Sequence, residues 1–136
     1  MKILIKGAGD LATGIASRLY GAGHRILMTE IPEPLTVRRT VALSRAVYEG
    51  SARVEDMNGI LAEDRYGAEK IMDAGDVAVM VDPGAGCREW FCPDVIVDAI
   101  KNGKTLEREP EYYIGGTAAA HAMPDWGNTY VDVDLS

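Results

Sequence analysis

The feature that most constrains the fold is a glycine-rich turn that directly follows a short apolar run at the start of the chain. The run Ile3-Leu4-Ile5 is apolar at every position, as expected of a parallel strand that is covered on both faces. It ends at Gly7, and from Asp10 the apolar residues recur with helical spacing until the glycines at 21 and 23. The pattern predicts a strand, a tight turn and a helix, which together begin a βαβ unit.

Three further apolar segments predict the rest of a mostly parallel sheet. Arg25 to Thr29 predicts the second strand, which carries Glu30 at its carboxyl end, and residues 76–81 and 94–98 predict a third and a fourth. The segments that connect them are a helix over 66–74 and a brief crossover over 87–91. Because such connections are right-handed, we expect the strand order 3-2-1-4. The sequence therefore predicts a Rossmann-like, three-layer α/β fold.

The other segments have less regular patterns. Residues 35–48 predict a helix that Gly50 ends. Asn58-Gly59, the strongest short hairpin signal, lies between two β-type segments and predicts a small hairpin insertion, at about 53–64, away from the main sheet. Strands are also expected at 112–114 and at 130–135, the latter as a half-exposed edge strand. We expect one domain over residues 1–136, with a poorly defined segment from about 101 onward.

Composition narrows the classes of partner. With 14 Lys and Arg against 21 Asp and Glu, the formal charge of −7 disfavours binding to nucleic acid or to an anionic membrane. The N-terminal apolar run is too short for a signal peptide or a membrane span, so we expect a cytoplasmic protein. Cys87 and Cys92 match no common zinc spacing and are interpreted as free thiols, with no metal site; the alternative is a redox or metal role in an oligomer that brings two such pairs together.

The glycine turn has the chemistry of a phosphate site. Gly7, Gly9 and Ala12 fit the pattern G-x-G-x-x-A, in which the first glycine permits the tight turn and the second removes a side chain that would block a phosphate. Ala12 lets the helix lie close to the strand. We expect this segment, including Asp10 and Leu11, to hold the phosphates of a dinucleotide or a similar cofactor at the helix N-terminus.

Glu30 lies about twenty residues beyond the turn, where a carboxylate can accept hydrogen bonds from the ribose hydroxyls of adenosine. A carboxylate there would repel a 2′-phosphate, which favours NAD over NADP. The alternative is a solvated strand end. Arg38 and Arg39 follow, and they are interpreted either as guanidinium ligands for a phosphate or carboxylate, or as solvated surface charges.

Three acidic residues have two interpretations each. Asp10 either caps the helix or contacts the ligand through a hydroxyl, a pterin nitrogen or a bridging cation. Asp82 and Asp98 end strands at the carboxyl edge of the sheet, where open α/β sheets bind ligands, and the alternative for each is loop capping. Neither His24 nor His121 completes a recognisable catalytic set.

Several segments together resemble one family. They are the run from Lys6 to Ala16, Met28-Thr29-Glu30-Ile31, Arg38-Arg39-Thr40-Val41, the segment from Ala46 to Gly50, Val81-Asp82-Pro83 and the segment from Pro93 to Ala99. The chain is similar in these segments to the YqeB-type accessory proteins of selenium-dependent molybdenum hydroxylase systems. The resemblance implies an XdhC-like Rossmann fold and a role beside a molybdenum hydroxylase, with the molybdenum cofactor as a further candidate ligand.

Three functions are compatible with these features. We expect an accessory module, not itself an enzyme, that binds a nucleotide-type small molecule and assists maturation or function of a molybdenum hydroxylase. The first alternative is a small NAD-dependent oxidoreductase whose site is completed by a second subunit. The second is a structural domain that binds no nucleotide. We also expect the chain to form a homo-oligomer.

Overall fold

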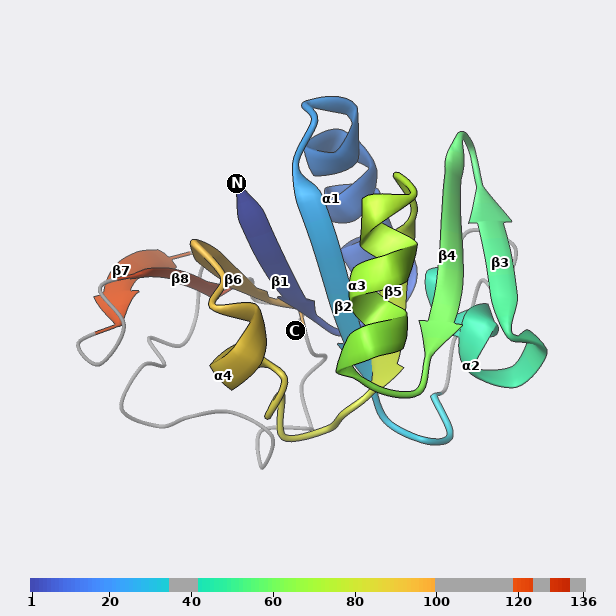
Figure 1. The fold of residues 1–136 in the computed structure, drawn as a ribbon. Coiled ribbons are helices and arrows are strands. Elements are labelled where there is room, and N and C mark those ends of the chain that lie inside the picture. The colour runs from blue at the N-terminus through green and yellow to red at the C-terminus, as the bar shows by residue number, and fades with distance from the viewer. Residues whose placement is uncertain (35–41, 100–118, 124–127, 133–136) are drawn as a thin grey trace.

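The computed structural model describes residues 1–34, 42–99, 119–123 and 128–132. In chain order, the elements within these ranges are β1 (Lys2–Lys6), α1 (Asp10–Gly21), β2 (Arg25–Glu30), the 3-10 helix η2 (Leu43–Arg45), α2 (Ala46–Glu49), β3 (Ser51–Val54), β4 (Met57–Ala62), α3 (Arg65–Asp73), β5 (Val77–Val81), α4 (Arg88–Phe91), β6 (Val95–Asp98), β7 (Ala119–Met123) and β8 (Asn128–Asp132). Figure 1 shows α3 and α4 in front of the sheet and α1 behind it.

The strands form one sheet in the order β3-β4-β5-β2-β1-β6-β8-β7. Its centre, β5-β2-β1-β6, is parallel throughout, and these are the four strands that the sequence predicts in the order 3-2-1-4. Helices cover both faces of this centre, which explains why its strands are continuous apolar runs. The predicted Rossmann-like, mostly parallel α/β fold is confirmed.

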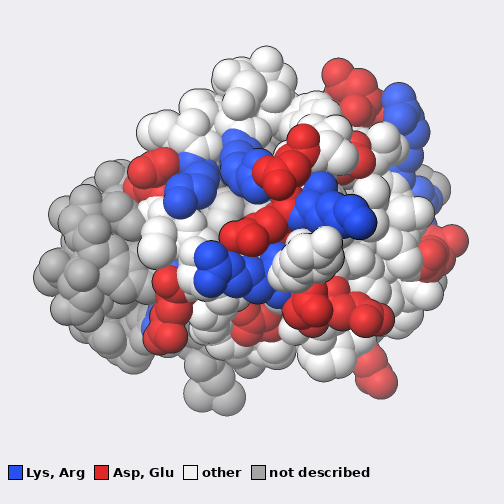
Figure 2. Space-filling view, in the orientation of Figure 1, with Lys and Arg blue, Asp and Glu red and all other residues white. Residues whose placement is uncertain are grey.

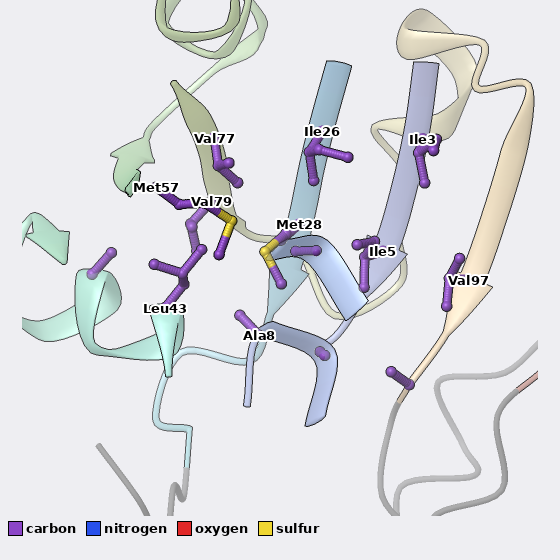
Figure 3. Close-up of a cluster of buried hydrophobic side chains, with 14 of the residues drawn as sticks. Ile3, Ile5, Ala8, Ile26, Met28, Leu43, Met57, Val77, Val79 and Val97 are labelled. Carbon is purple, nitrogen blue, oxygen red and sulfur yellow. The ribbon is translucent and has the colours of Figure 1, made fainter. Parts of the chain in front are cut away.

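Successive side chains along each central strand point to opposite faces of the sheet, which divides the core into two clusters. In β1, Ile3 and Ile5 pack on the side of α1 and η2, whereas Leu4 packs on the side of α3 and α4. Figure 3 shows the first cluster, in which Ala8 and Leu43 lie at the same end. That end is the carboxyl edge of the central strands, because Ala8 lies two residues beyond the end of β1. The two faces of this edge therefore have different surroundings.

Glycines and one aspartate define where the two longer helices begin and end. Gly9 is the N-cap of α1, and Gly23, with a φ of +91°, follows its last turn. Helix α3 begins after Asp64, whose side chain accepts a hydrogen bond from the Gly67 N–H at 2.7 Å, one residue earlier than predicted. Among the described helices, none has the length and apolar character required to cross a membrane.

The hairpin exists, but its predicted turn and placement are wrong. Its strands β3 and β4 pair with Val54 opposite Met57, so the chain turns at Glu55 and Asp56 rather than at Asn58-Gly59. In addition, β4 pairs in parallel with β5 and so joins the main sheet. The glycine serves packing, since a Cβ at Gly59 would lie 2.9 Å from the Leu43 Cδ2 atom.

The predicted helix over 35–48 is shorter in its described part, and residues 35–41 lie outside the description. Ala42 is extended, with φ −126° and ψ 131°, so no helix passes through it. The chain then forms η2 and α2, which Gly50 ends with a φ of +85°, as predicted. Helix η2 begins late because the N–H groups of Leu43 and Ser44 donate to Thr13 and Ala8.

The C-terminal strand also differs from the prediction. The segment predicted at 130–135 forms β8 at Asn128–Asp132, and it is not an edge strand. It pairs in parallel with β6 and antiparallel with β7, an alanine-rich strand that strand propensity does not favour. The strand expected at 112–114 lies outside the described residues.

Candidate functional site

The glycine turn, residues 7–12, joins the carboxyl end of β1 to α1. Gly7 has a φ of +107°, which strongly favours glycine, and its N–H donates to the Thr29 carbonyl at 2.8 Å. Gly9 has a φ of −70° and a ψ of −171°. A Cβ built on Gly9 would meet none of the described atoms within 4 Å. Gly7 therefore lets the chain turn, whereas Gly9 leaves space in front of the helix.

The next three residues begin α1. Because Asp10 is the first helical residue, the N-cap position falls on Gly9, which has no side chain to cap the helix. The side chain of Asp10 is not among those described. Leu11 is 44% exposed. Ala12 is buried in the core, as expected of a residue that allows the helix to lie close against the sheet.

The Glu30 carboxylate lies beside the glycine turn and is held there by backbone N–H groups. Its Oε1 atom accepts from Ala8 N at 3.0 Å, and its Oε2 atom accepts from Ile31 N at 2.8 Å. A carboxylate has about four acceptor positions, so these two bonds do not exhaust it. The register places Val81, which is 39% exposed, next to Glu30 on the same face of the sheet. The structure thus brings together the turn and the predicted carboxylate.

Thr13 braces the turn from inside the fold, a role that the motif alone does not show. The side chain is buried, and its hydroxyl donates to the Ala8 carbonyl at 3.2 Å. The same hydroxyl accepts from Leu43 N at 2.9 Å, and Ser44 N donates to the Ala8 carbonyl at 2.8 Å. The signal in the sequence is a hydroxyl in an otherwise apolar or small-residue helix face, one turn after the glycines.

Asp82 organises the loop that follows β5. Its Oδ1 atom accepts from Gly86 N at 3.1 Å and its Oδ2 atom accepts from Cys87 N at 2.8 Å, contacts of the loop-capping kind. Burial and, to a lesser extent, the hydrogen bond to Asp82 raise the pKa of the Cys87 thiol well above its usual range. The thiol is therefore protonated at neutral pH. Contact between Asp82 and a ligand stays a prediction.

Asp98 is buried on the other face of the sheet. It is opposite Lys6 in the register, and Asp98 Oδ2 lies 3.9 Å from Lys6 Nζ, with the two side chains 0% and 1% exposed. Thr29 is next to Lys6 on the following strand and is also buried. These residues form a polar row beneath the carboxyl edge. The sequence predicted Asp98 as a ligand contact and missed Lys6; ligand contact by Asp98 stays a prediction.

The remaining predicted site residues and the surface charges add context. Arg38 and Arg39 lie outside the described residues.

Figure 2 shows Lys and Arg interspersed with Asp and Glu over the α3 and α4 face, where Arg65 pairs with Glu69 at 3.1 Å. The described residues contain no group of three or more metal-ligating side chains. The free thiols are Cys87, which is buried, and Cys92, which is exposed.

Comparison with known proteins gives one informative similarity. The chain is 41% identical over 98 residues to YqeB of Escherichia coli (strain K12), which is described as an uncharacterized protein. The alignment covers 72% of this chain and 18% of YqeB, so the chain spans less than a fifth of that relative. No protein-family model and no solved structure matches. The similarity to YqeB supports the relationship of this chain to the YqeB family.

Proposed function

We propose that the chain binds a phosphate-bearing nucleotide, in the first instance a dinucleotide such as NAD, at the carboxyl edge beside the glycine turn. The observation that carries the proposal is the contact between Glu30 Oε1 and Ala8 N at 3.0 Å. It fixes a carboxylate suited to a ribose next to a helix start suited to a phosphate. The topology supports this placement, because α/β sheets bind ligands where the strand order reverses, here at β1.

The residues present fit both parts of such a ligand. Within the described part of the chain no atom lies within 4 Å of a Cβ built on Gly9, and the N–H groups at the start of α1 provide a partial positive charge for a diphosphate. Glu30 has acceptor capacity left for ribose hydroxyls, and its negative charge disfavours a 2′-phosphate. Val81 offers an exposed apolar surface beside Glu30 for a base. This arrangement binds and orients a ligand.

We further propose that binding serves an accessory role in a molybdenum hydroxylase system. The support is the sequence similarity to YqeB together with the resemblance of the segments from Lys6 to Ala16 and from Pro93 to Ala99 to such accessory proteins. A nucleotide-bearing form of the molybdenum cofactor would present the same diphosphate and ribose to the glycine turn and Glu30. We also propose that the chain associates with a molybdenum hydroxylase and with a second copy of itself.

Calorimetric titration with NAD, NADP, ADP and a molybdopterin dinucleotide tests the proposed function. We expect at least one diphosphate ligand to bind, NAD to bind more tightly than NADP, and no hydride to be transferred. Gly9→Trp should abolish binding, because the indole would fill the open space before α1. Gly21→Trp is the matched control at the other end of the same helix, where a Cβ also meets open space. Absence of binding by all four ligands would refute the proposal.

A further inference from the structure

We propose that Thr13 is a positioning residue for the phosphate site, because its hydroxyl fixes the peptide group between Ala8 and Gly9. This inference rests on the proposed function, since it concerns how the turn presents an N–H group to a bound diphosphate. The two can fail separately, because the effect of Thr13 is measured relative to binding by the unaltered protein.

The contacts of Ala8 show how the turn is held. Its carbonyl accepts from the Thr13 hydroxyl at 3.2 Å and from Ser44 N at 2.8 Å, while its N–H donates to Glu30 Oε1 at 3.0 Å. Both peptide groups that meet at Ala8 are therefore fixed by other parts of the fold. Thr13 is 1% exposed, so water does not compete for its hydroxyl.

Peptide geometry links the Ala8 carbonyl to the ligand side of the turn. The described chain has no cis peptide bond, so the C=O of Ala8 and the N–H of Gly9 point in opposite directions within one plane. The carbonyl points into the fold toward Thr13 and Ser44. The N–H of Gly9 consequently points away from Thr13 and Ser44. Gly9 is also the residue at which a built Cβ would meet none of the described atoms within 4 Å.

The Thr13 hydroxyl acts in both directions, which neither valine nor alanine can do. It donates to Ala8 and accepts from Leu43 N at 2.9 Å, so it ties the turn to the segment that begins η2. Leu43 in turn lies so close to Gly59 of β4 that a Cβ built on this glycine would be 2.9 Å from the Leu43 Cδ2 atom. The glycine turn is therefore braced by a strand of the hairpin through a chain of three contacts.

A diphosphate and a nucleoside distinguish positioning from general support. If Thr13 directs the Gly9 N–H toward a phosphate, loss of the Thr13 hydroxyl weakens the binding of ligands that carry phosphate. The binding of adenosine, which would contact only the base and ribose part of the site, stays unchanged. A purely structural role would weaken both ligands alike. The ratio of the ADP and adenosine affinities is therefore the informative measurement.

The test compares Thr13→Val, which keeps the shape and removes the hydroxyl, with Thr13→Ser, which keeps the hydroxyl. We expect Thr13→Val to lower the ADP affinity by about 5- to 10-fold, as for loss of one hydrogen bond, and to change the adenosine affinity by less than about twofold. Thr13→Ser should restore the ADP affinity. Ser17→Ala is the control, since it removes from the same helix a hydroxyl that donates to the exposed Glu55 at 2.9 Å, away from the glycine turn.

Three results would overturn the inference: equal losses for ADP and adenosine, no loss with Thr13→Val, or no recovery with Thr13→Ser. If the unaltered protein binds none of NAD, NADP, ADP and the molybdopterin dinucleotide, the proposed function fails and the inference fails with it; if it binds NAD but not ADP, the same comparison is made with NAD in place of ADP. Should Thr13→Val not fold, the amide proton of Gly9 is followed in the unaltered protein. It should shift with ADP and with inorganic pyrophosphate but not with adenosine, and an equal shift with adenosine would contradict the proposal.

Discussion

Glu30 ends β2 and Asp98 ends β6, the two strands that flank β1, but their carboxylates have different surroundings. Glu30 is half-buried on the α1 side and accepts hydrogen bonds from two backbone N–H groups. Asp98 is fully buried on the opposite side, across from the Lys6 ammonium. An acidic residue at a strand end can thus hold a turn and keep acceptor capacity, or neutralise a buried charge. Whether the side chain points to one face or the other decides between these roles.

The largest expected effect is at the buried pair. Asp98→Ala leaves Lys6 buried without this carboxylate, so we expect the free energy of unfolding to fall by about 3–5 kcal/mol. Urea denaturation measures this loss. The double variant Lys6→Met with Asp98→Leu should recover much of it, because it removes both charges. A loss below about 1 kcal/mol for Asp98→Ala would show that the pair is unimportant for stability.

The two glycines of the turn should separate folding from binding. Gly7→Ala forces a side chain into a φ of +107°, and we expect it to reduce the free energy of unfolding by about 1–3 kcal/mol. Gly9→Ala, the matched control, has an ordinary φ of −70° and open space, so its stability should stay close to that of the unaltered protein. Thermal and urea denaturation compare them. Equal losses would contradict the different roles assigned to the two residues.

Glu30→Gln should have a moderate effect on stability and a specific effect on binding. Glutamine keeps one carbonyl acceptor but presents an amide NH₂ to the second backbone N–H, so we expect a loss of about 1 kcal/mol. Removal of the negative charge should also raise the affinity for NADP relative to NAD. Parallel titrations with both dinucleotides measure the ratio, and an unchanged ratio would argue against ribose recognition by Glu30.

The smallest effect is expected at the surface of the α3 and α4 face. Arg65 and Glu69 pair at 3.1 Å, but their side chains are 60% and 43% exposed. Water and salt screen such a pair, so Glu69→Ala, which leaves Arg65 over the Trp90 ring, should change the free energy of unfolding by no more than about 0.5 kcal/mol. Urea denaturation at low and high salt checks this. A loss comparable to that of Asp98→Ala would remove the distinction between exposed and buried pairs.

The central fold was predictable because several local signals agree. The apolar run before Gly7, the small residues of α1 and the apolar strand before Glu30 all favour a parallel sheet with helices on both faces, and the structure confirms it. The hairpin was predicted with the wrong turn. Gly59 has the sequence signal of a turn residue, but in the structure it lies in β4, where a Cβ would come within 2.9 Å of the side chain of Leu43, a residue distant in the sequence.

The candidate site was predictable in part for the same reason. The glycine turn and Glu30 follow from spacing, and they lie together in the structure. The brace at Thr13 and the partner of Asp98 do not follow from spacing. They depend on tertiary packing and on strand register, which place Leu43 beside Thr13 and Lys6 opposite Asp98.

The central claim is that the turn and Glu30, rather than the polar row at Lys6 and Asp98, receive a nucleotide. The most direct test is a crystal structure of the protein grown with ADP at a concentration that saturates binding in solution. We predict the diphosphate at the start of α1, within hydrogen-bond distance of the Gly9 N–H, and the ribose against the Glu30 carboxylate. ADP bound elsewhere, above all against Lys6 and Asp98, would contradict the account.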